Sequence, residues 1–340
     1  MRLHRVPGSA AILAVVVALV AAGCGSSSGG SSSSSKTASP TAAPKYPTKA
    51  ISYISPFAAG GGAYLVAERQ LPYLEKDLGQ NLVITSVSGA SGALGWTQVA
   101  QATPDGYTVG LIGLPNIVVQ PLGGTAGYTT SQLDPVCLTV GQPLVLAVPL
   151  TSPYTTLQQY LAAAKAAPGT ITVGGSGSLT SVNLATLNLE KTAGVKLQYV
   201  SYDGGAAQVA AFLGNHVDSV IFNASDILPY VSQARILAVS TSTAYAAFPG
   251  VKTFEAQGVD LVQETYYGMA VPLNTPSYVM TTLENACMKT TADSTFKAAT
   301  VKAGTETVLM DHAQAAAEIQ KEITAYQNIV SWAGINGLLG

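Results

Sequence analysis

The chain repeats one pattern twice near its N-terminal end: a short apolar run, a glycine-rich turn and a helix-forming stretch. The first copy has its apolar run at 51–55 and its turn at 56–62, and the second has them at 82–86 and 88–92. A glycine-rich turn at a helix start exposes backbone N–H groups, and the helix dipole there favours an anion. Two such turns on neighbouring strands predict convergence on one small anionic group. Glycine-rich turns are also ordinary strand-to-helix connections, so both interpretations stay open here.

The N-terminus has the features of an export signal. A basic start is followed by an apolar run at 10–22 and by small residues before Cys24, which predicts a signal peptide at 1–23. The sequence Ala-Ala-Gly-Cys resembles a bacterial lipobox, whose cysteine receives a diacylglyceryl group, and two acyl chains suffice for stable anchoring. Residues 24–45 are then the lipidated cysteine and a flexible Ser/Gly-rich linker. We therefore expect an extracytoplasmic protein that is lipid-anchored to the cell membrane; the alternative is an ordinary signal peptide with a disordered N-terminus.

The charge and cysteine content exclude several classes of partner. The chain has 16 Lys and Arg against 18 Asp and Glu and shows no basic cluster, which argues against nucleic acid as a partner. No Cys/His spacing typical of a metal site is present, and we expect no metal and no cofactor. Apart from Cys24, the cysteines are Cys137 and Cys287. They form either a disulfide in an oxidising compartment or two buried free thiols.

Strands and helices continue to alternate along the rest of the chain. The strand–loop–helix pattern returns twice, with loops at 174–178 and 201–205. Alternation of this kind predicts an α/β protein with parallel sheets and helices on both faces, and ligands bind at the carboxyl ends of such strands. We expect domain 1 at 46–147 plus 271–340 and domain 2 at 148–270, each a sheet flanked by helices. Four Gly/Ser-rich loops would then line one cleft between them. The remaining predicted strands are 107–112, 136–140, 143–148, 217–222, 235–240 and 266–271, and the later helices are 155–166, 277–289, 293–303 and 311–329.

A series of short motifs runs through the chain in order: YPTK at 46–49, PFAAGGG at 56–62, GASGALG at 89–95, TPDGYT at 103–108, GSGS at 175–178, YDGGAA at 202–207, PGVKTF at 249–254 and YGMAVP at 267–272. Together they resemble the Bug/TctC receptors, the solute-binding proteins of tripartite tricarboxylate transporters. The resemblance implies a two-domain periplasmic-binding (Venus flytrap) fold. It also implies a monomeric receptor that captures a small carboxylated solute through backbone N–H groups and delivers it to integral membrane permease subunits.

The loops and the resemblance together predict the ligand-binding residues. They are Phe57, Ala58, Gly60, Gly61, Gly62, Tyr64, Gly89, Ala90, Ser91, Gly92, Asn116, Ser176, Ser178, Asn183, Tyr202, Asp203, Gly204, Asn223 and Ser225. Two positions depart from the family pattern, because Tyr64 stands where the family often has Asp and Asn183 stands where it often has His. An amino group of a ligand would lose its counter-charge at Tyr64. We therefore expect a carboxylate without an amino group.

Two other functions compete with a transport receptor. A secreted α/β hydrolase would need a nucleophile and a base, but the sequence around Ser176 lacks the G-x-S-x-G spacing. His216 and His312 are expected at exposed polar positions rather than as bases, and Tyr267 is expected to pack in the core. We therefore expect no enzyme activity. A sensor that feeds a signalling partner has the same sequence features as a transport receptor, so that alternative stays open.

Overall fold

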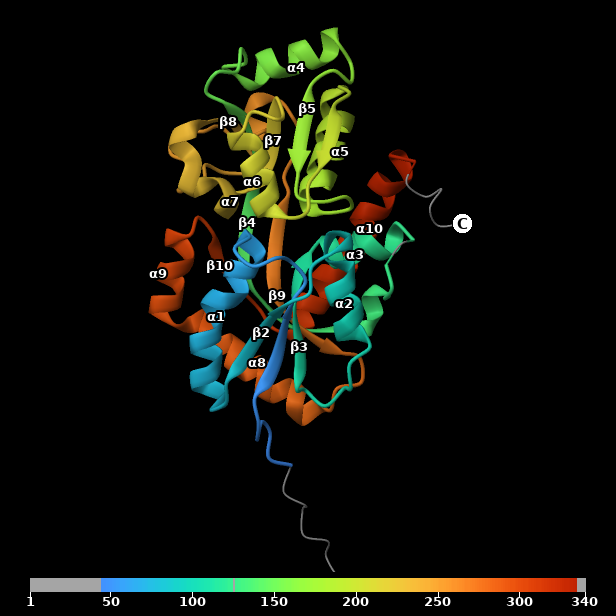
Figure 1. The fold of residues 1–340 in the computed structure, drawn as a ribbon, viewed down its shortest axis with the longest axis vertical. Coiled ribbons are helices and arrows are strands. Elements are labelled where there is room, and N and C mark those ends of the chain that lie inside the picture. Colours follow the sequence, from blue (N-terminus) through green and yellow to red (C-terminus); the bar gives the residue numbers. More distant parts are fainter. Residues whose placement is uncertain (1–43, 125, 335–340) are drawn as a thin grey trace, which may run out of the picture. The chain divides into compact units, whose positions relative to one another are not determined.

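The computed structural model describes residues 44–124 and 126–334 (Figure 1). The predicted signal peptide at 1–23, the lipidation site Cys24 and nearly all of the linker at 24–45 lie outside the described residues. Within the two described ranges, no helix is both long enough and apolar enough to cross a membrane.

One mixed sheet runs through the described chain, and its strands follow the order β2-β1-β3-β9-β4-β7-β5-β6, with β8 and β10 also pairing with β4. We divide this sheet into two regions that share β4, and we call the region built on the first part of β4 the first sheet region. It comprises β1 (Ile51–Ser55), β2 (Leu82–Ser86), β3 (Thr108–Leu114), β9 (Glu264–Pro272), β10 (Glu306–Met310) and the first part of β4 (Leu133–Pro149). The second sheet region comprises the rest of β4 with β5 (Thr172–Gly175), β6 (Gln198–Ser201), β7 (Ser219–Asn223) and β8 (Ala234–Val239).

Helices cover both faces of each sheet region, as expected for this fold class. In the first region, α1 and α8 share one apolar cluster with the sheet, and α2, α3 and α10 share another. In the second region, α4 and α5 pack on one face and α6 on the other. The helix bounds are α1 (Gly62–Leu78), α2 (Ala93–Ala100), α3 (Asn116–Leu122), α4 (Leu157–Ala166), α5 (Ser181–Ala193), α6 (Gly205–Leu213), α7 (Ala224–Ile227), α8 (Ser277–Ala292), α9 (Ser294–Lys302) and α10 (His312–Trp332).

Strand β4 joins the two sheet regions. Its residues up to Pro143 pair with β9, whereas Leu144–Ala147 pair with β7 and Val145–Pro149 pair with β8. The strands predicted at 136–140 and 143–148 both lie within β4, but they are one continuous strand, because Pro143 lies where the strand changes partners. The pairs of β9 with β3 and β4 are antiparallel, so the sheet is mixed rather than wholly parallel. The domain boundaries at 147/148 and 270/271 remain a prediction.

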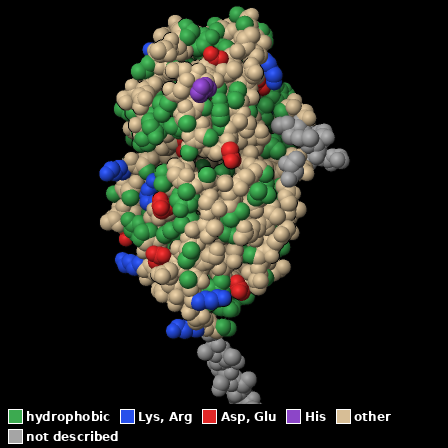
Figure 2. Space-filling view, in the orientation of Figure 1, with side chains coloured by type: hydrophobic (Ala, Val, Ile, Leu, Met, Phe, Trp, Pro, Cys, Tyr) green, Lys and Arg blue, Asp and Glu red, His purple; other side chains and the backbone are tan. Residues whose placement is uncertain are grey.

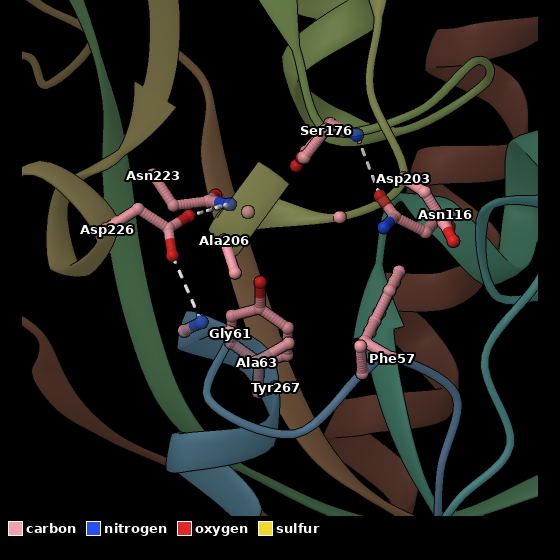
Figure 3. A pocket seen from close by; sticks show the side chains of 15 residues that line it. Phe57, Gly61, Ala63, Asn116, Ser176, Asp203, Ala206, Asn223, Asp226 and Tyr267 are labelled. Carbon is pink, nitrogen blue, oxygen red and sulfur yellow. Dashed lines mark hydrogen bonds between the residues drawn. The ribbon is translucent and has the colours of Figure 1, made fainter. Parts of the chain in front are cut away.

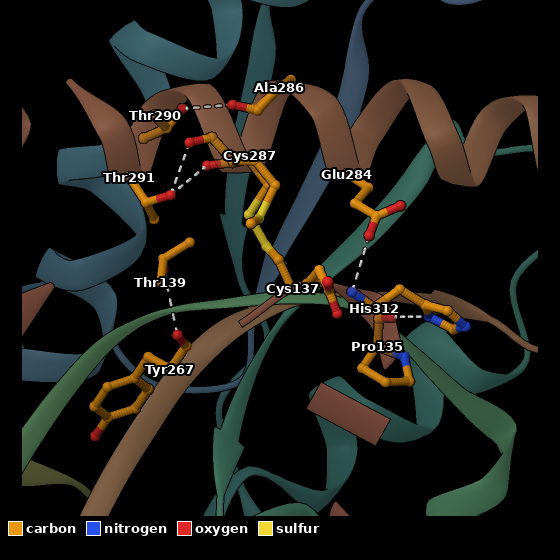
Figure 4. Close-up of a disulfide and its surroundings, with 12 residues drawn as sticks. Pro135, Cys137, Thr139, Tyr267, Glu284, Ala286, Cys287, Thr290, Thr291 and His312 are labelled. Carbon is orange, nitrogen blue, oxygen red and sulfur yellow. Dashed lines mark hydrogen bonds between the residues drawn. A yellow bond between two sulfur atoms is a disulfide. The ribbon is translucent and has the colours of Figure 1, made fainter. Parts of the chain in front are cut away.

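A disulfide joins the sheet to the helix layer in the first region. Cys137 on β4 is bonded to Cys287 on α8, both side chains are fully buried, and 150 positions separate them in sequence (Figure 4). Of the two alternatives that the sequence left open, the structure has the disulfide. The bond fixes α8 against the strand that continues into the second sheet region.

Candidate functional site

A small cavity lies where the two sheet regions meet, and a hollow opens on the face shown in Figure 2. Most of its lining residues lie at or after the carboxyl ends of β1, β3, β5, β6 and β7, which is where α/β sheets bind ligands. The cavity volume is about 30 Å³, which is room for about two water molecules. Its lining residues are Phe57, Ala58, Gly61, Gly62, Ala63, Asn116, Ser176, Ser181, Asp203, Gly204, Gly205, Ala206, Asn223, Asp226 and Tyr267.

The loop after β1 forms one wall and is held in place by side chains around it. The hydroxyl groups of Ser55 and Ser86 donate hydrogen bonds of 3.1 and 2.8 Å to the carbonyl oxygen of Phe57. The Phe57 ring packs edge-on against the buried Trp96, with 5.6 Å between ring centroids. Phe57 is therefore a fixed apolar wall of the cavity.

The start of α1 is occupied by an acidic side chain of the second sheet region. The N–H of Gly61 donates to the Ala58 carbonyl at 3.3 Å, and the N–H of Gly62 donates to Asp226 Oδ1 at 3.0 Å (Figure 3). Helix α6 begins beside the same carboxylate, because an ideal Cβ at Gly205 would lie 2.8 Å from Asp226 Oδ1. The absence of a side chain at Gly62 and Gly205 lets this carboxylate approach both helix starts.

Asp226 is a buried carboxylate with few partners. Only 9% of the residue is exposed, and its other close polar neighbour is Asn223 Nδ2 at 3.4 Å. Burial raises the pKa of Asp226 to about 6, although the hydrogen bonds from Asn223 and Gly62 act in the opposite direction. No Lys, Arg or His is among the described residues that line the cavity.

Polar groups that can hydrogen-bond a ligand lie around the rest of the cavity. Asn116 at the start of α3 accepts a 2.7 Å hydrogen bond from the Ser181 N–H of α5, which joins the two sheet regions. Ser176 follows β5, and Figure 3 shows it across the cavity from Tyr267. Residues 204–206 line the cavity at the start of α6, where the first N–H groups of a helix have no carbonyl partner within that helix.

The structure brings about half of the sequence-predicted ligand-binding residues to this cavity. The residues that line it are Phe57, Ala58, Gly61, Gly62, Asn116, Ser176, Asp203, Gly204 and Asn223. The residues that do not line it are Gly60, Tyr64, Gly89, Ala90, Ser91, Gly92, Ser178, Asn183, Tyr202 and Ser225. The role of both groups in ligand binding remains a prediction.

Local packing explains several of these positions. The second glycine-rich loop lies behind Phe57, because an ideal Cβ at Gly92 would be 2.8 Å from the Trp96 ring and 3.3 Å from the Phe57 ring. Asn183 accepts a 3.0 Å hydrogen bond from the N–H of Leu179 and so stabilises its own loop. Tyr202 packs against an apolar cluster of the second sheet region.

Five lining residues were not predicted from the sequence: Ala63, Ser181, Gly205, Ala206 and Asp226. Asn223 is the last residue of β7, and Ser225 and Asp226 follow that strand by two and three positions. The topological signal that selected Asn223 and Ser225 therefore also applies to Asp226. Tyr267 is only 3% exposed, as its predicted core position requires, but it also lines the cavity.

The described residues contain no arrangement typical of catalysis or metal binding near the cavity. His216 is exposed, and His312 is half-buried with its Nδ1 atom 2.6 Å from the Pro135 carbonyl oxygen on β4. Neither histidine lines the cavity with Ser176. Within residues 44–124 and 126–334, no group of three His, Cys, Asp or Glu side chains could hold a metal ion.

The sequence and the fold of this chain match known proteins of one family. The family model of the tripartite tricarboxylate transporter family receptor, TctC, matches residues 66–335. A UPF0065 protein of the gbd 5′ region of Cupriavidus necator is 30% identical over 283 residues, which are 82% of this chain and 86% of the relative. A solved periplasmic transporter is 27% identical, with a TM-score of 0.81 over 86% of this chain and 99% of the other. Rpa4515 of R. palustris, solved with adipate, is 23% identical and has the same fold, with a TM-score of 0.81 over 85% of this chain and 99% of its own.

Proposed function

Because this chain belongs to the TctC family of tripartite tricarboxylate transporter receptors, we propose that it captures a small carboxylated solute and delivers it to membrane permease subunits. Members of this family are extracytoplasmic solute-binding proteins and not enzymes. In the proposed arrangement, a lipid anchor at Cys24 holds a monomeric receptor near its permease.

The observation that carries the proposal is the cavity at the carboxyl ends of five strands. Its wall combines an aromatic ring, Phe57, with a few convergent polar groups, which is the usual composition of a small-molecule site. Both sheet regions contribute to it, as a receptor that encloses its ligand requires.

Hydrogen-bond donors rather than cationic side chains would hold the carboxylate of the solute. The N–H groups of Gly205 and Ala206 at the start of α6 are suited to this role, since a helix start attracts an anion. The N–H of Gly62, in contrast, already donates to Asp226. Adipate, found with Rpa4515, is a carboxylate held by a protein of the same fold.

Entry of a solute requires the two sheet regions to separate. The cavity of about 30 Å³ is too small for an organic acid, and hydrogen bonds join the two sheet regions beside it. Gln120 Nε2 donates to the carbonyl oxygens of Ser178 and Leu179 at 3.1 and 3.0 Å, and Asn116 accepts from Ser181. We infer a hinge motion through β4 and β9, so the measured affinity includes the free energy of closing the cleft.

A thermal-shift screen of the full-length chain tests the function. A solute that binds only the native state raises the melting temperature, so at least one small carboxylate should do so. In the matched variant Gly61→Val the new side chain fills the cavity, while the nearest atom to its Cβ, the Ala58 carbonyl oxygen, is an ordinary 3.4 Å away. The variant should melt like the parent and lose the ligand-induced shift. The proposal fails if no carboxylate stabilises the parent, or if the variant responds equally.

A further inference from the structure

Asp226 is a buried negative charge in the cavity without a cationic partner. Asp226 takes part in none of the ion pairs of the described chain. The basic residues of its surroundings, Arg69 and Lys302, line a separate pocket beyond Gly62 and Ser225. A buried carboxylate without a counter-charge is unfavourable, and such groups in proteins are normally paired. A cationic group of a bound ligand would supply the missing partner.

The Asp226 carboxylate has unused capacity for such a partner. An ionised carboxylate has about four acceptor positions, and here one is taken by the Gly62 N–H and one by the Asn223 amide at the longer distance of 3.4 Å. With a pKa of about 6, the group is mostly ionised at neutral pH. Figure 3 shows Asp226 on the side of the cavity opposite Phe57.

The position of Asp226 removes the reason for expecting a ligand without an amino group. The sequence favoured a ligand without an amino group, because Tyr64 stands where the family often has Asp. The structure supplies a carboxylate from another element: Asp226 lies 3.0 Å from the N–H of Gly62, only two positions before Tyr64. Tyr64 itself does not line the cavity. The counter-charge is therefore present, but it comes from a residue 164 positions away in sequence.

The same charge opposes a ligand with two carboxylates. Asp203 also lines the cavity and is exposed, so water and salt screen its charge, whereas the charge of Asp226 is buried and screened much less. A second ligand carboxylate close to Asp226 would meet a like charge and no cationic side chain. A cationic nitrogen at the same place would meet an attractive charge.

We propose that Asp226 determines the specificity of this cavity by binding a cationic nitrogen of the solute, so that the receptor selects zwitterions over simple mono- and dicarboxylates. The inference rests on the proposed function, since it concerns the solute of the same site. The ammonium group of the solute lies against Asp226, and its carboxylate lies at the N–H groups that begin α6. Because Gly205 of α6 lies beside Asp226, the two charged groups must be close together in the ligand, as in an α- or β-amino acid.

Matched pairs of ligands test this inference on the full-length chain. Each pair shares a carbon skeleton and differs in the amino group: alanine and propionate, β-alanine and propionate, aspartate and succinate, phenylalanine and 3-phenylpropionate. Calorimetric titration near neutral pH should give, for at least one pair, an amino member that binds about tenfold tighter or more. Equal or tighter binding of the members without an amino group overturns the inference and leaves the proposed function standing. Absence of binding in every pair overturns both.

Two variants assign the preference to Asp226. Asp226→Asn keeps the shape and the acceptor for Gly62 but removes the charge, so binding of the amino member should weaken by about thirtyfold, and binding of its partner should not weaken. Asp260→Asn removes an equal charge at an exposed position outside the cavity and should leave both affinities unchanged. The inference is overturned if Asp226→Asn retains the preference for the amino member, or if Asp260→Asn loses it to the same extent.

Discussion

Replacing Asp226 by Asn should stabilise the ligand-free protein at neutral pH, although it removes a charge that is hydrogen-bonded. The pKa of Asp226 is about 6 in the folded protein and 3.8 ordinarily. This gap of about two pH units corresponds to about 3 kcal/mol, by which ionised Asp226 lowers the free energy of unfolding. Asn is uncharged and can still accept the Gly62 N–H, so the variant should recover most of this amount.

The stability difference between the parent and Asp226→Asn should shrink as the pH falls. Because the pKa is raised by folding, the folded protein binds a proton between about pH 6 and pH 4 while the unfolded chain does not, so the stability of the parent increases as the pH falls. At about pH 5 the parent should have regained about 1.4 kcal/mol, roughly half of its deficit relative to the variant. Asp134, Glu306 and Glu322 also have pKa values raised by burial. They are present in both proteins and cancel in the difference.

Urea unfolding of the parent, Asp226→Asn and the control Asp260→Asn at about pH 7.5 and pH 5 measures this difference directly. The variant should be more stable by about 2–3 kcal/mol at the higher pH and by clearly less at the lower pH. The control should stay within about 0.5 kcal/mol of the parent at both. A less stable Asp226→Asn at about pH 7.5, or a difference that does not change with pH, would refute the reasoning that burial dominates at this carboxylate.

Three further substitutions test the scaffold, each by urea unfolding. Replacing Cys137 and Cys287 together by Ala opens a link across 150 positions and should lower the free energy of unfolding by up to about 5 kcal/mol; a reductant should bring the parent to the same value, and no change would contradict this. Asp311→Ala removes the side chain that accepts a 2.8 Å hydrogen bond at the start of α10, at a cost of about 1 kcal/mol. Trp96→Phe loses the 3.0 Å bond to the Leu111 carbonyl and should cost about 1–3 kcal/mol; a smaller loss would mean that water replaces the bond.

The elements that the sequence predicted well are those whose pattern is local. The strands at 51–55 and 82–86 have the predicted bounds, and α2 begins at Ala93, directly after the predicted turn at 88–92. Elements that depend on distant partners were missed. The strand β10 has exposed and half-buried residues, and it pairs with β4 across more than 160 positions, so its own sequence carries little signal. The gap predicted between the strands at 136–140 and 143–148 is absent for the same reason: β4 accommodates Pro143 because the strand changes its partner there.

The residues of the candidate site likewise divide into those that the sequence could predict and those that depend on distant contacts. Loops at strand carboxyl ends were predictable because topology alone places them, and Phe57, Asn116 and Ser176 all line the cavity. Sequence could not show that the second glycine-rich loop lies behind Phe57, since this depends on how Trp96 fills the space below Gly92. Nor could it show the meeting of Asp226 with Gly62, which requires the two sheet regions to be placed together.

The glycine-rich start of α1 holds an anion in this structure, and that anion comes from the protein itself. A glycine-rich helix start was predicted to bind a negative group, and the start of α1 does hold a carboxylate at 3.0 Å, but it belongs to Asp226. The need for glycine is the same for a protein carboxylate as for a ligand, because any Cβ at Gly62 or Gly205 would overlap Asp226. Because the Asp226 carboxylate already occupies the start of α1, this part of the cavity attracts a cation. The glycine-rich start of α1, which predicted a receptor for simple carboxylates, therefore favours in the folded protein a solute that carries both charges.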